Sequence, residues 1–187
     1  MSIFDKLKKN VQSAVKTATS SAFSSAETFT FSSLPESLDE MKALPEAALQ
    51  NPFATAALTV CALCVYAANK EIGAEMLNFL RGPRPLSNHD ISFLNDRFRD
   101  GHHVAFSYFK GAVSENDYTP DTPFSVTVTS GPYSDANEGY KKLFIQSGGA
   151  DSPREIVLRK LGDGRWMLWD QFLLVSIKKP KSDDPWA

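Results

Sequence analysis

The hydrophobic pattern of this chain changes its period once, near residue 101. Before that point the apolar side chains recur at helical spacing; after it they alternate with polar ones, as in Phe124, Val126 and Val128. Helices followed by alternating strands are typical of an α+β domain. We therefore predict an α+β fold with N-terminal helices followed by an antiparallel β-sheet that packs on a long central helix.

The long central helix is expected between Asn51 and about Leu80. The Asn51 side chain can cap the first turn of the helix. Pro52 has no backbone N–H, but at the first helical position an N–H would have no partner within the helix, so the proline is tolerated there. The helix should stop at Gly82-Pro83. Its first half, 53–68, is apolar nearly all round, which favours a buried helix. This run is shorter than the roughly 20 strongly apolar residues that a membrane span needs.

Shorter elements are expected on both sides of this helix. Ser37 and Glu40 have the spacing of a capping box, and Pro45 should begin a second short helix. A further helix is expected near 88–99. The sequence Gly162-Asp163-Gly164 is typical of a hairpin turn. Strands are predicted at 102–108, 124–129, 141–147, 154–161, 165–169 and 172–178.

Residues 1–22 differ from the rest of the chain in charge and in pattern. They carry four lysines against one aspartate, a net charge of +3, whereas the remaining residues, with 16 basic and 21 acidic side chains, carry −5. Their apolar residues follow the spacing of one helical face. Such a helix can contact an anionic membrane surface, a partner protein or its own domain. The contact residues are expected to be Ile3, Phe4, Lys6, Leu7, Lys8, Lys9 and Val11.

The composition divides the chain into four parts. We expect a basic amphipathic helix at 1–22, a Ser/Thr-rich linker at 23–33, a globular α+β domain at 34–181 and an acidic tail at 182–187. An apolar fraction of 42% excludes global disorder. Trp186 follows two aspartates, and we expect it either to anchor the tail in a groove of this domain or to reach another protein.

The chemistry-bearing residues form no pattern typical of a catalytic or metal site. Cys61 and Cys64 have C-x-x-C spacing, but they lie inside an apolar helical run, which favours two small buried side chains over redox or zinc chemistry. His89 is expected in the first turn of a helix. The small-residue loop 147–154 favours a hairpin connection over a phosphate loop. We predict no cofactor and no metal, and a net charge of −2 gives no reason to expect a nucleic-acid partner.

Much of the chain resembles a bacterial protein family known only as a domain of unknown function. The likeness lies in SGGADSPR at 147–154, GDGRWMLW at 162–169 and DDPWA at 183–187, and also in NDYTPDTPFSVTVTSGPYSDANEGYKK and Leu34-Pro35-Glu36-Ser37-Leu38. The resemblance implies a bacterial cytoplasmic protein and assigns no functional residue. Separately, the opening MSIFDKLKKNVQSAV is similar to the amphipathic starts of bacterial envelope-stress proteins.

Two functions follow as hypotheses. The first is a non-enzymatic binding or scaffolding module of the cytoplasm, peripheral to the inner face of the cell membrane, in which residues 1–22 contact membrane, a partner or a second copy. The second is a ligand-binding or hydrolase domain with a pocket between sheet and helices, as in folds resembling the nuclear transport factor 2 type. A cavity with converging polar groups would favour the second hypothesis. The residues expected to line it are Tyr108, Tyr140, Arg154, Trp166 and Trp169.

Overall fold

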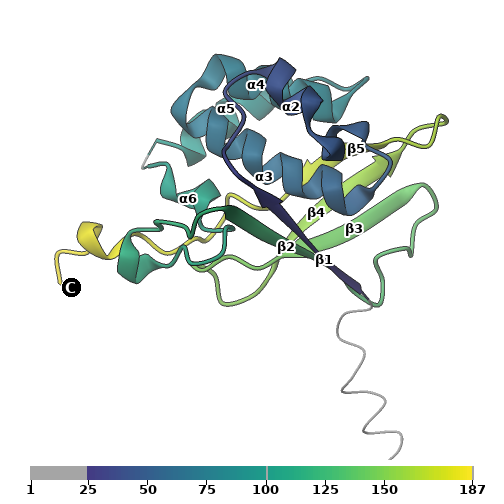
Figure 1. Cartoon of the computed structure of the whole chain (residues 1–187). Coiled ribbons are helices and arrows are strands. Elements are labelled where there is room, and N and C mark those ends of the chain that lie inside the picture. The colour runs from purple at the N-terminus through teal and green to yellow at the C-terminus, as the bar shows by residue number, and fades with distance from the viewer. Residues whose placement is uncertain (1–24, 100, 187) are drawn as a thin grey trace, which may run out of the picture.

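The computed structural model describes residues 25–99 and 101–186, and it contains a five-stranded antiparallel sheet that carries its main helices on one face (Figure 1). The sheet order is β1-β2-β3-β4-β5. The strands are β1 (Ser25–Phe31), β2 (Phe124–Ser130), β3 (Tyr140–Ile145), β4 (Arg154–Lys160) and β5 (Trp166–Gln171). The α-helices are α2 (Leu38–Ala43), α3 (Pro52–Ala68), α4 (Lys70–Arg81), α5 (Asn88–Arg97) and α6 (His103–Phe106), and 3-10 turns lie at Pro45–Ala48, Ser114–Asn116 and Lys181–Asp183. The α+β class is confirmed.

Helix α3 lies at the centre of the fold, as its apolar pattern predicts. Asn51 Oδ1 accepts the N–H of Phe53 at 2.9 Å, which is the expected cap. Every residue from Phe53 to Tyr66 is buried. The sheet covers this helix with its inward-facing side chains, which are Val126, Val128, Leu143, Ile145, Ile156 and Leu158. Among the helices of the described residues, none has the length and hydropathy to cross a membrane.

The central helix is shorter than predicted, because it ends at Ala68 and not near Leu80. Asn69 is extended (φ −140°, ψ 103°), and its side-chain oxygen accepts the N–H groups of Glu71 and Ile72, so it caps a separate helix α4. The first turn of α4 then packs against the end of α3 at Gly73, where a Cβ would stand 2.2 Å from the Cα of Tyr66. The prediction was wrong because Asn69 does not interrupt the apolar period.

The stretch predicted as a Ser/Thr-rich linker contains the edge strand β1. It pairs along its whole length with β2, from Ser25 opposite Ser130 to Phe31 opposite Phe124. Phe31 is buried, and Phe29 packs against the core. Threonine and phenylalanine favour strands as strongly as serine favours loops. The partner strand lies beyond all the main helices in the sequence, so the local composition alone could not reveal this pairing.

Two of the predicted strands are helix or turn in the structure. Part of 102–108 forms α6, and 172–178 forms turns after β5. Arg154 holds the second segment, since its Nε donates to the carbonyl of Val175 at 3.1 Å and its Nη2 to that of Ser176 at 2.9 Å. These carbonyls therefore bind a side chain and not a neighbouring strand. The predicted hairpin turn is confirmed by the bond from the N–H of Leu161 to the carbonyl of Arg165.

Candidate functional site

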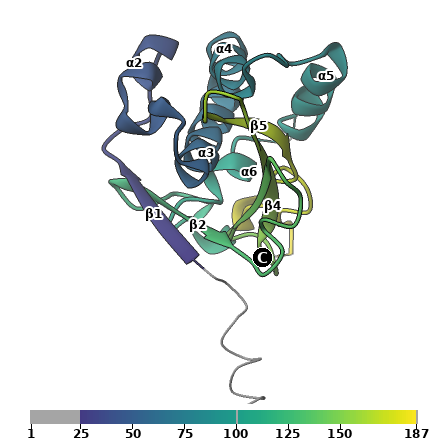
Figure 2. The same cartoon turned by 90° about the vertical axis from the view of Figure 1, so that its right-hand side faces the viewer.

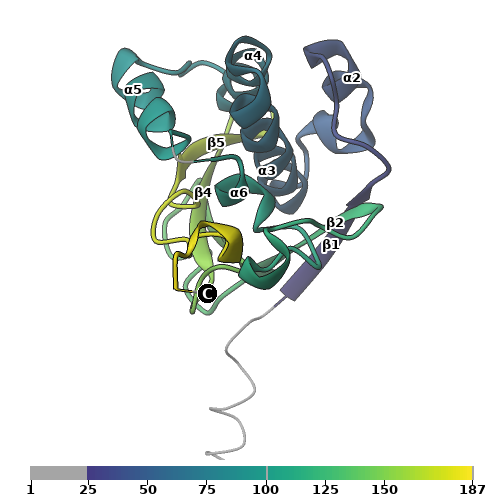
Figure 3. The ribbon, with the colours of Figure 1, turned by 90° about the vertical axis from the view of Figure 1, so that its left-hand side faces the viewer.

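A cavity of about 260 Å³ lies where α4 and α5 pack over β5. Figure 3 shows these three elements together at one side of the molecule. Most of the lining is apolar and comes from three helices, one strand and the segments that connect them: Leu63 of α3, Leu77 of α4, Phe93 and Leu94 of α5, Leu168 of β5, and Leu86, Phe172 and Val175 from connecting segments. The polar lining groups are Arg81, His89, Asp90, Asp170 and Gln171, so two carboxylates lie at the cavity with the guanidinium.

Arg81 is a buried charged residue at this cavity, with a side chain only 6% exposed. It is the last residue of α4, and Gly82 ends the helix with a φ of 59°. Its Nε donates to the carbonyl of Arg84 at 3.0 Å, and its Nη2 donates to Oδ2 of Asp90 at 3.4 Å. Burial lowers the pKa of the guanidinium, and the nearby Asp90 opposes this shift. The group remains positively charged, because an arginine does not lose its proton in a protein.

Asp90 faces Arg81 and also caps α5. Its N–H donates to Ser87 Oγ at 3.2 Å, while its Oδ2 accepts the Ser87 N–H at 2.8 Å and the Ser87 hydroxyl at 2.7 Å. Burial raises the pKa of the Asp90 carboxyl, but the bonds from Ser87 and the positive charges of Arg81 and Arg84 outweigh burial and hold this pKa below its usual range. The sequence already contains the signature of this capping box, Ser87-x-x-Asp90.

One nitrogen of Arg81, Nη1, has no hydrogen-bond acceptor among the described residues. No buried polar side-chain atom of these residues lacks a partner. Nη1 must therefore be in contact with solvent, although the side chain as a whole is buried. Because Arg81 lines the cavity, an acceptor atom on a molecule bound there could receive these N–H groups.

The lining combines apolar side chains with a few charged and polar ones. No serine, threonine or cysteine is among the described residues that line the cavity. Ser87 lies next to it, but its hydroxyl donates directly to a carboxylate, whereas a catalytic triad needs a base such as histidine between the two. His89 makes no hydrogen bond to either residue in the described part of the chain. The arrangement can hold an apolar group beside a guanidinium.

Of the residues predicted to line a pocket, the structure brings Tyr140 and Trp169 together, but elsewhere. Their rings meet edge to face with centroids 5.6 Å apart. The Arg159 guanidinium lies 4.6 Å from the Trp169 ring and 5.3 Å from the Tyr140 ring, and that of Arg84 lies 4.5 Å from Trp169. Both rings border a second, more open hollow of about 450 Å³. Because Arg84 and Arg159 lie against these rings, the ring faces are already in contact with arginine side chains.

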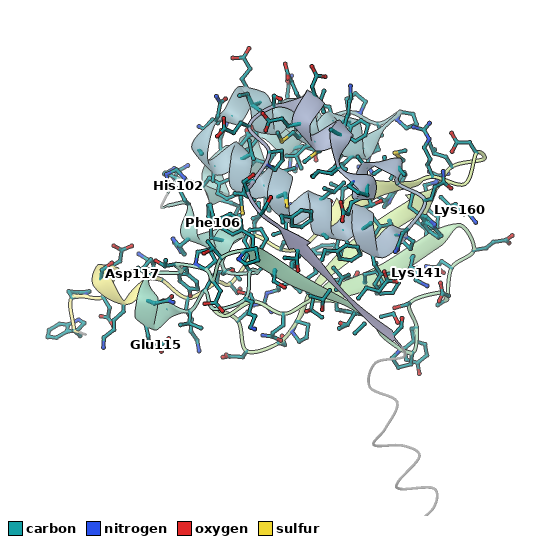
Figure 4. All side chains as sticks on the ribbon, viewed as in Figure 1. His102, Phe106, Glu115, Asp117, Lys141 and Lys160 are labelled. Atoms are coloured by element: carbon teal, nitrogen blue, oxygen red, sulfur yellow. The ribbon has the colours of Figure 1, made fainter. Side chains whose placement is uncertain are left out.

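The other three predicted lining residues have structural roles. Tyr108 is buried and donates its hydroxyl to the carbonyl of Leu173; burial raises the pKa of this phenol. Arg154 holds the turns after β5, as described above. The ring of Trp166 lies 5.6 Å from the Lys160 Nζ. Figure 4 places Lys160 near the right-hand edge of the molecule and Phe106, which ends α6 two residues before Tyr108, well away from it on the left. The five predicted residues thus do not form one pocket.

The remaining predicted features have different outcomes. Trp186 is 93% exposed, which is at odds with anchoring in a groove of its own domain, while contact with another protein stays a prediction. Cys61 and Cys64 are buried as expected, and burial raises the pKa of both thiols.

The loop 147–154 joins β3 to β4, as predicted. The N–H groups of Gly148 and Gly149 donate to Ser107 and Ser147, so two of its backbone donors are already used within the protein. The predicted contact residues Ile3 to Val11 lie outside the described residues.

The fold and this site define an α+β domain with an apolar cavity between two helices and the last strand of its sheet. The chain belongs to the family described as Domain of unknown function (DUF6935), whose model matches residues 33–181. The predicted membership in a family without an assigned activity is thereby confirmed, whereas the bacterial origin stays a prediction. The matched range begins after β1. No curated protein and no solved structure matches the chain.

Proposed function

We propose that this protein is a non-enzymatic binding module whose α4–α5–β5 cavity holds a small apolar ligand with one hydrogen-bond acceptor group. The observation that carries the proposal is the combination of apolar walls with the buried Arg81, whose Nη1 has no acceptor among the described residues. Ligand sites commonly combine such walls with a few placed polar groups. The ligand's apolar body would lose contact with water, and its acceptor group would bind the guanidinium.

The size of the cavity limits the ligand. Sites for drug-sized molecules usually enclose roughly 300–1,000 Å³, and this cavity is slightly smaller. It therefore suits a single ring or a short acyl chain, and a nucleotide would not fit. Asp90 and Asp170 both line the cavity and offset the charge of Arg81, so the acceptor group could be a neutral carbonyl or a carboxylate.

Filling the cavity should abolish ligand binding. Val175 lines the cavity and is only half-buried, so Val175→Trp can occupy the space with little effect on folding. We expect hexanoate to shift the amide resonances of residues around the cavity in the wild-type protein, and to leave them unchanged in this variant. Val113→Trp, at an exposed site away from the cavity, is the matched control and should bind like the wild type.

The role of Arg81 can be measured with the same titration. Arg81→Gln should reduce the preference for hexanoate over hexanol by about tenfold, because a charge-assisted hydrogen bond is lost. If neither hexanoate nor octanoate shifts any resonance in the wild type, or if Val175→Trp binds as well as Val113→Trp, the cavity is not a ligand site.

A second function is proposed for residues 1–22, namely peripheral contact with an anionic membrane surface. Its support is the net charge of +3 on a segment with one apolar helical face, against −5 on the rest of the chain. Each lysine near such a surface contributes about 1 kcal/mol. The first described residue, Ser25, is exposed and begins an edge strand. This contact would place the protein in the cytoplasm, at the inner face of the cell membrane.

Co-sedimentation with vesicles tests this contact. The full chain should pellet with vesicles rich in phosphatidylglycerol at low salt and be released by high salt, because screening weakens the attraction. A chain that begins at Phe23 keeps β1 and should stay in the supernatant. Neutral phosphatidylcholine vesicles are the control. Equal pelleting of the two chains on the anionic vesicles would rule out a membrane role for residues 1–22.

A further inference from the structure

Among the strands of the described residues, β1 has a neighbour on one side only. Figures 2 and 3 show it as the outermost strand of the sheet, and no other strand of the described residues lies beyond it. Such an edge readily pairs with a strand of another chain unless lysine, proline or a bulge prevents it. β1 has the sequence SAETFTF and an unbroken register with β2. Its one charged residue, Glu27, accepts a hydrogen bond from Asn51 Nδ2 at 2.7 Å, within the same molecule.

The register with β2 shows which backbone groups of β1 point outward. Ser125 of β2 lies opposite Thr30, and its carbonyl accepts the N–H of Lys110 at 2.8 Å, on the side away from β1. Residues directly opposite in an antiparallel ladder exchange both hydrogen bonds or neither, so Thr30 and Ser125 form a non-bonded pair. By alternation, Ala26, Thr28 and Thr30 direct their N–H and C=O groups to the free edge.

We infer that β1 pairs antiparallel with β1 of a second copy of this chain, with Thr28 on the twofold axis. Thr28 is the middle residue of the strand, so this register pairs β1 over its full length. Thr28 then faces Thr28 of the second copy, and Ala26 faces Thr30, so that outward backbone groups meet outward backbone groups.

Side-chain chemistry supports this occupant. In the proposed register Glu27 faces Phe29 of the other copy and not a second glutamate, so like charges do not meet across the new pair. Thr28 already forms a hydroxyl–hydroxyl bond of 2.7 Å with Thr127 of β2, a cross-strand pair of the kind that the twofold axis would repeat. The strand is therefore complementary to itself, which makes the contact isologous and closes it at two copies.

The dimer can be tested by sedimentation equilibrium of the full chain. We expect a reversible dimer, and Thr28→Lys should weaken it by at least about tenfold, because two lysines would face each other on the axis. Its unfolding temperature should match that of Thr127→Lys. This control loses the same hydroxyl bond on an exposed face of the next strand, and it should leave the dimer intact.

The register is tested by cross-linking. Cα atoms of a hydrogen-bonded antiparallel pair lie about 5.5 Å apart, so a short bifunctional thiol reagent should join two copies of Thr28→Cys. Thr127→Cys is the matched control and should remain uncoupled. The native Cys61 and Cys64 are buried and should not react.

Three outcomes would overturn the inference. They are a full chain that is monomeric at every concentration, a dimer that Thr28→Lys leaves unchanged, and equal cross-linking of the two cysteine variants. A chain beginning at Phe23 that dimerises while the full chain stays monomeric would also overturn it, because the chain's own first residues would then cover the edge.

Discussion

Gly73→Ala is expected to lower the free energy of unfolding by about 3 kcal/mol or more. An added Cβ at this position would lie 2.2 Å from the Cα and 2.4 Å from the backbone N of Tyr66, so backbone atoms and not a side-chain tip would have to move. Alanine is normally the better helix former by about 0.5–1 kcal/mol, but that gain is much smaller than the cost of separating two packed helices.

The measurement is urea-induced unfolding of Gly73→Ala beside Gly162→Ala. Gly162 lies in the β4–β5 turn, and an added Cβ there would meet no atom within 4 Å, so this control should change stability by less than about 0.5 kcal/mol. Equal midpoints for the two variants would mean that α3 and α4 do not approach as closely as the structure shows. Because Leu63 and Leu77 line the cavity from these same helices, Gly73→Ala should also weaken hexanoate binding.

A chain that begins at Leu34 is expected to lose its cooperative unfolding transition. It would lack β1, which supplies the whole ladder on one side of β2, and with it the side chain of Phe31, which is only 3% exposed. Removing a single buried phenylalanine side chain costs about 3–5 kcal/mol, a large part of the roughly 5–15 kcal/mol by which domains are stable.

The same experiment shows whether the folding unit begins where the family match begins or further toward the N-terminus, at β1. The family match begins at residue 33, so a chain from Leu34 retains nearly all of the matched range, whereas a chain from Phe23 also retains β1. We expect the chain from Phe23 to melt like the full chain, as followed by circular dichroism. If the chain from Leu34 melts with equal cooperativity at the same temperature, β1 is not part of the folding unit.

The cap of α3 and the turn between β4 and β5 were predicted correctly because their interactions are local. Asn51 binds the N–H of a residue two positions later, and the Gly162-Asp163-Gly164 turn joins adjacent strands. Asn69 shows the limit of predicting caps from the sequence. It caps α4 as Asn51 caps α3, but this cap was not predicted because the apolar spacing continues across it. Its extended backbone is stable because Gly73 lets the two helices pack tightly.

The candidate site was predicted only in outline. A pocket between sheet and helices was one of the two hypotheses, but the residues expected to line it were chosen for their type, and the structure does not gather them around one cavity. Arg81 and Asp90 come from different helices, and nothing in their sequence context shows that they meet. The capping box around Asp90 was readable, and it could have drawn attention to the start of α5.

The sequence alone determined the α+β class, the buried position of α3 and most of the sheet from β2 to β5. These depend on hydrophobic period and on turn residues, whose interactions span a few positions along the chain. Only the tertiary structure decided that Ser25–Phe31 is a strand, that the central helix breaks at Asn69, and that Arg81 and Asp90 share a cavity. The pairing of Ser25–Phe31 joins segments that are far apart in the sequence, and a local pattern contains no information about the free energy of such contacts. The break at Asn69 and the contact between Arg81 and Asp90 involve residues near each other in the chain, but they depend on how the helices pack.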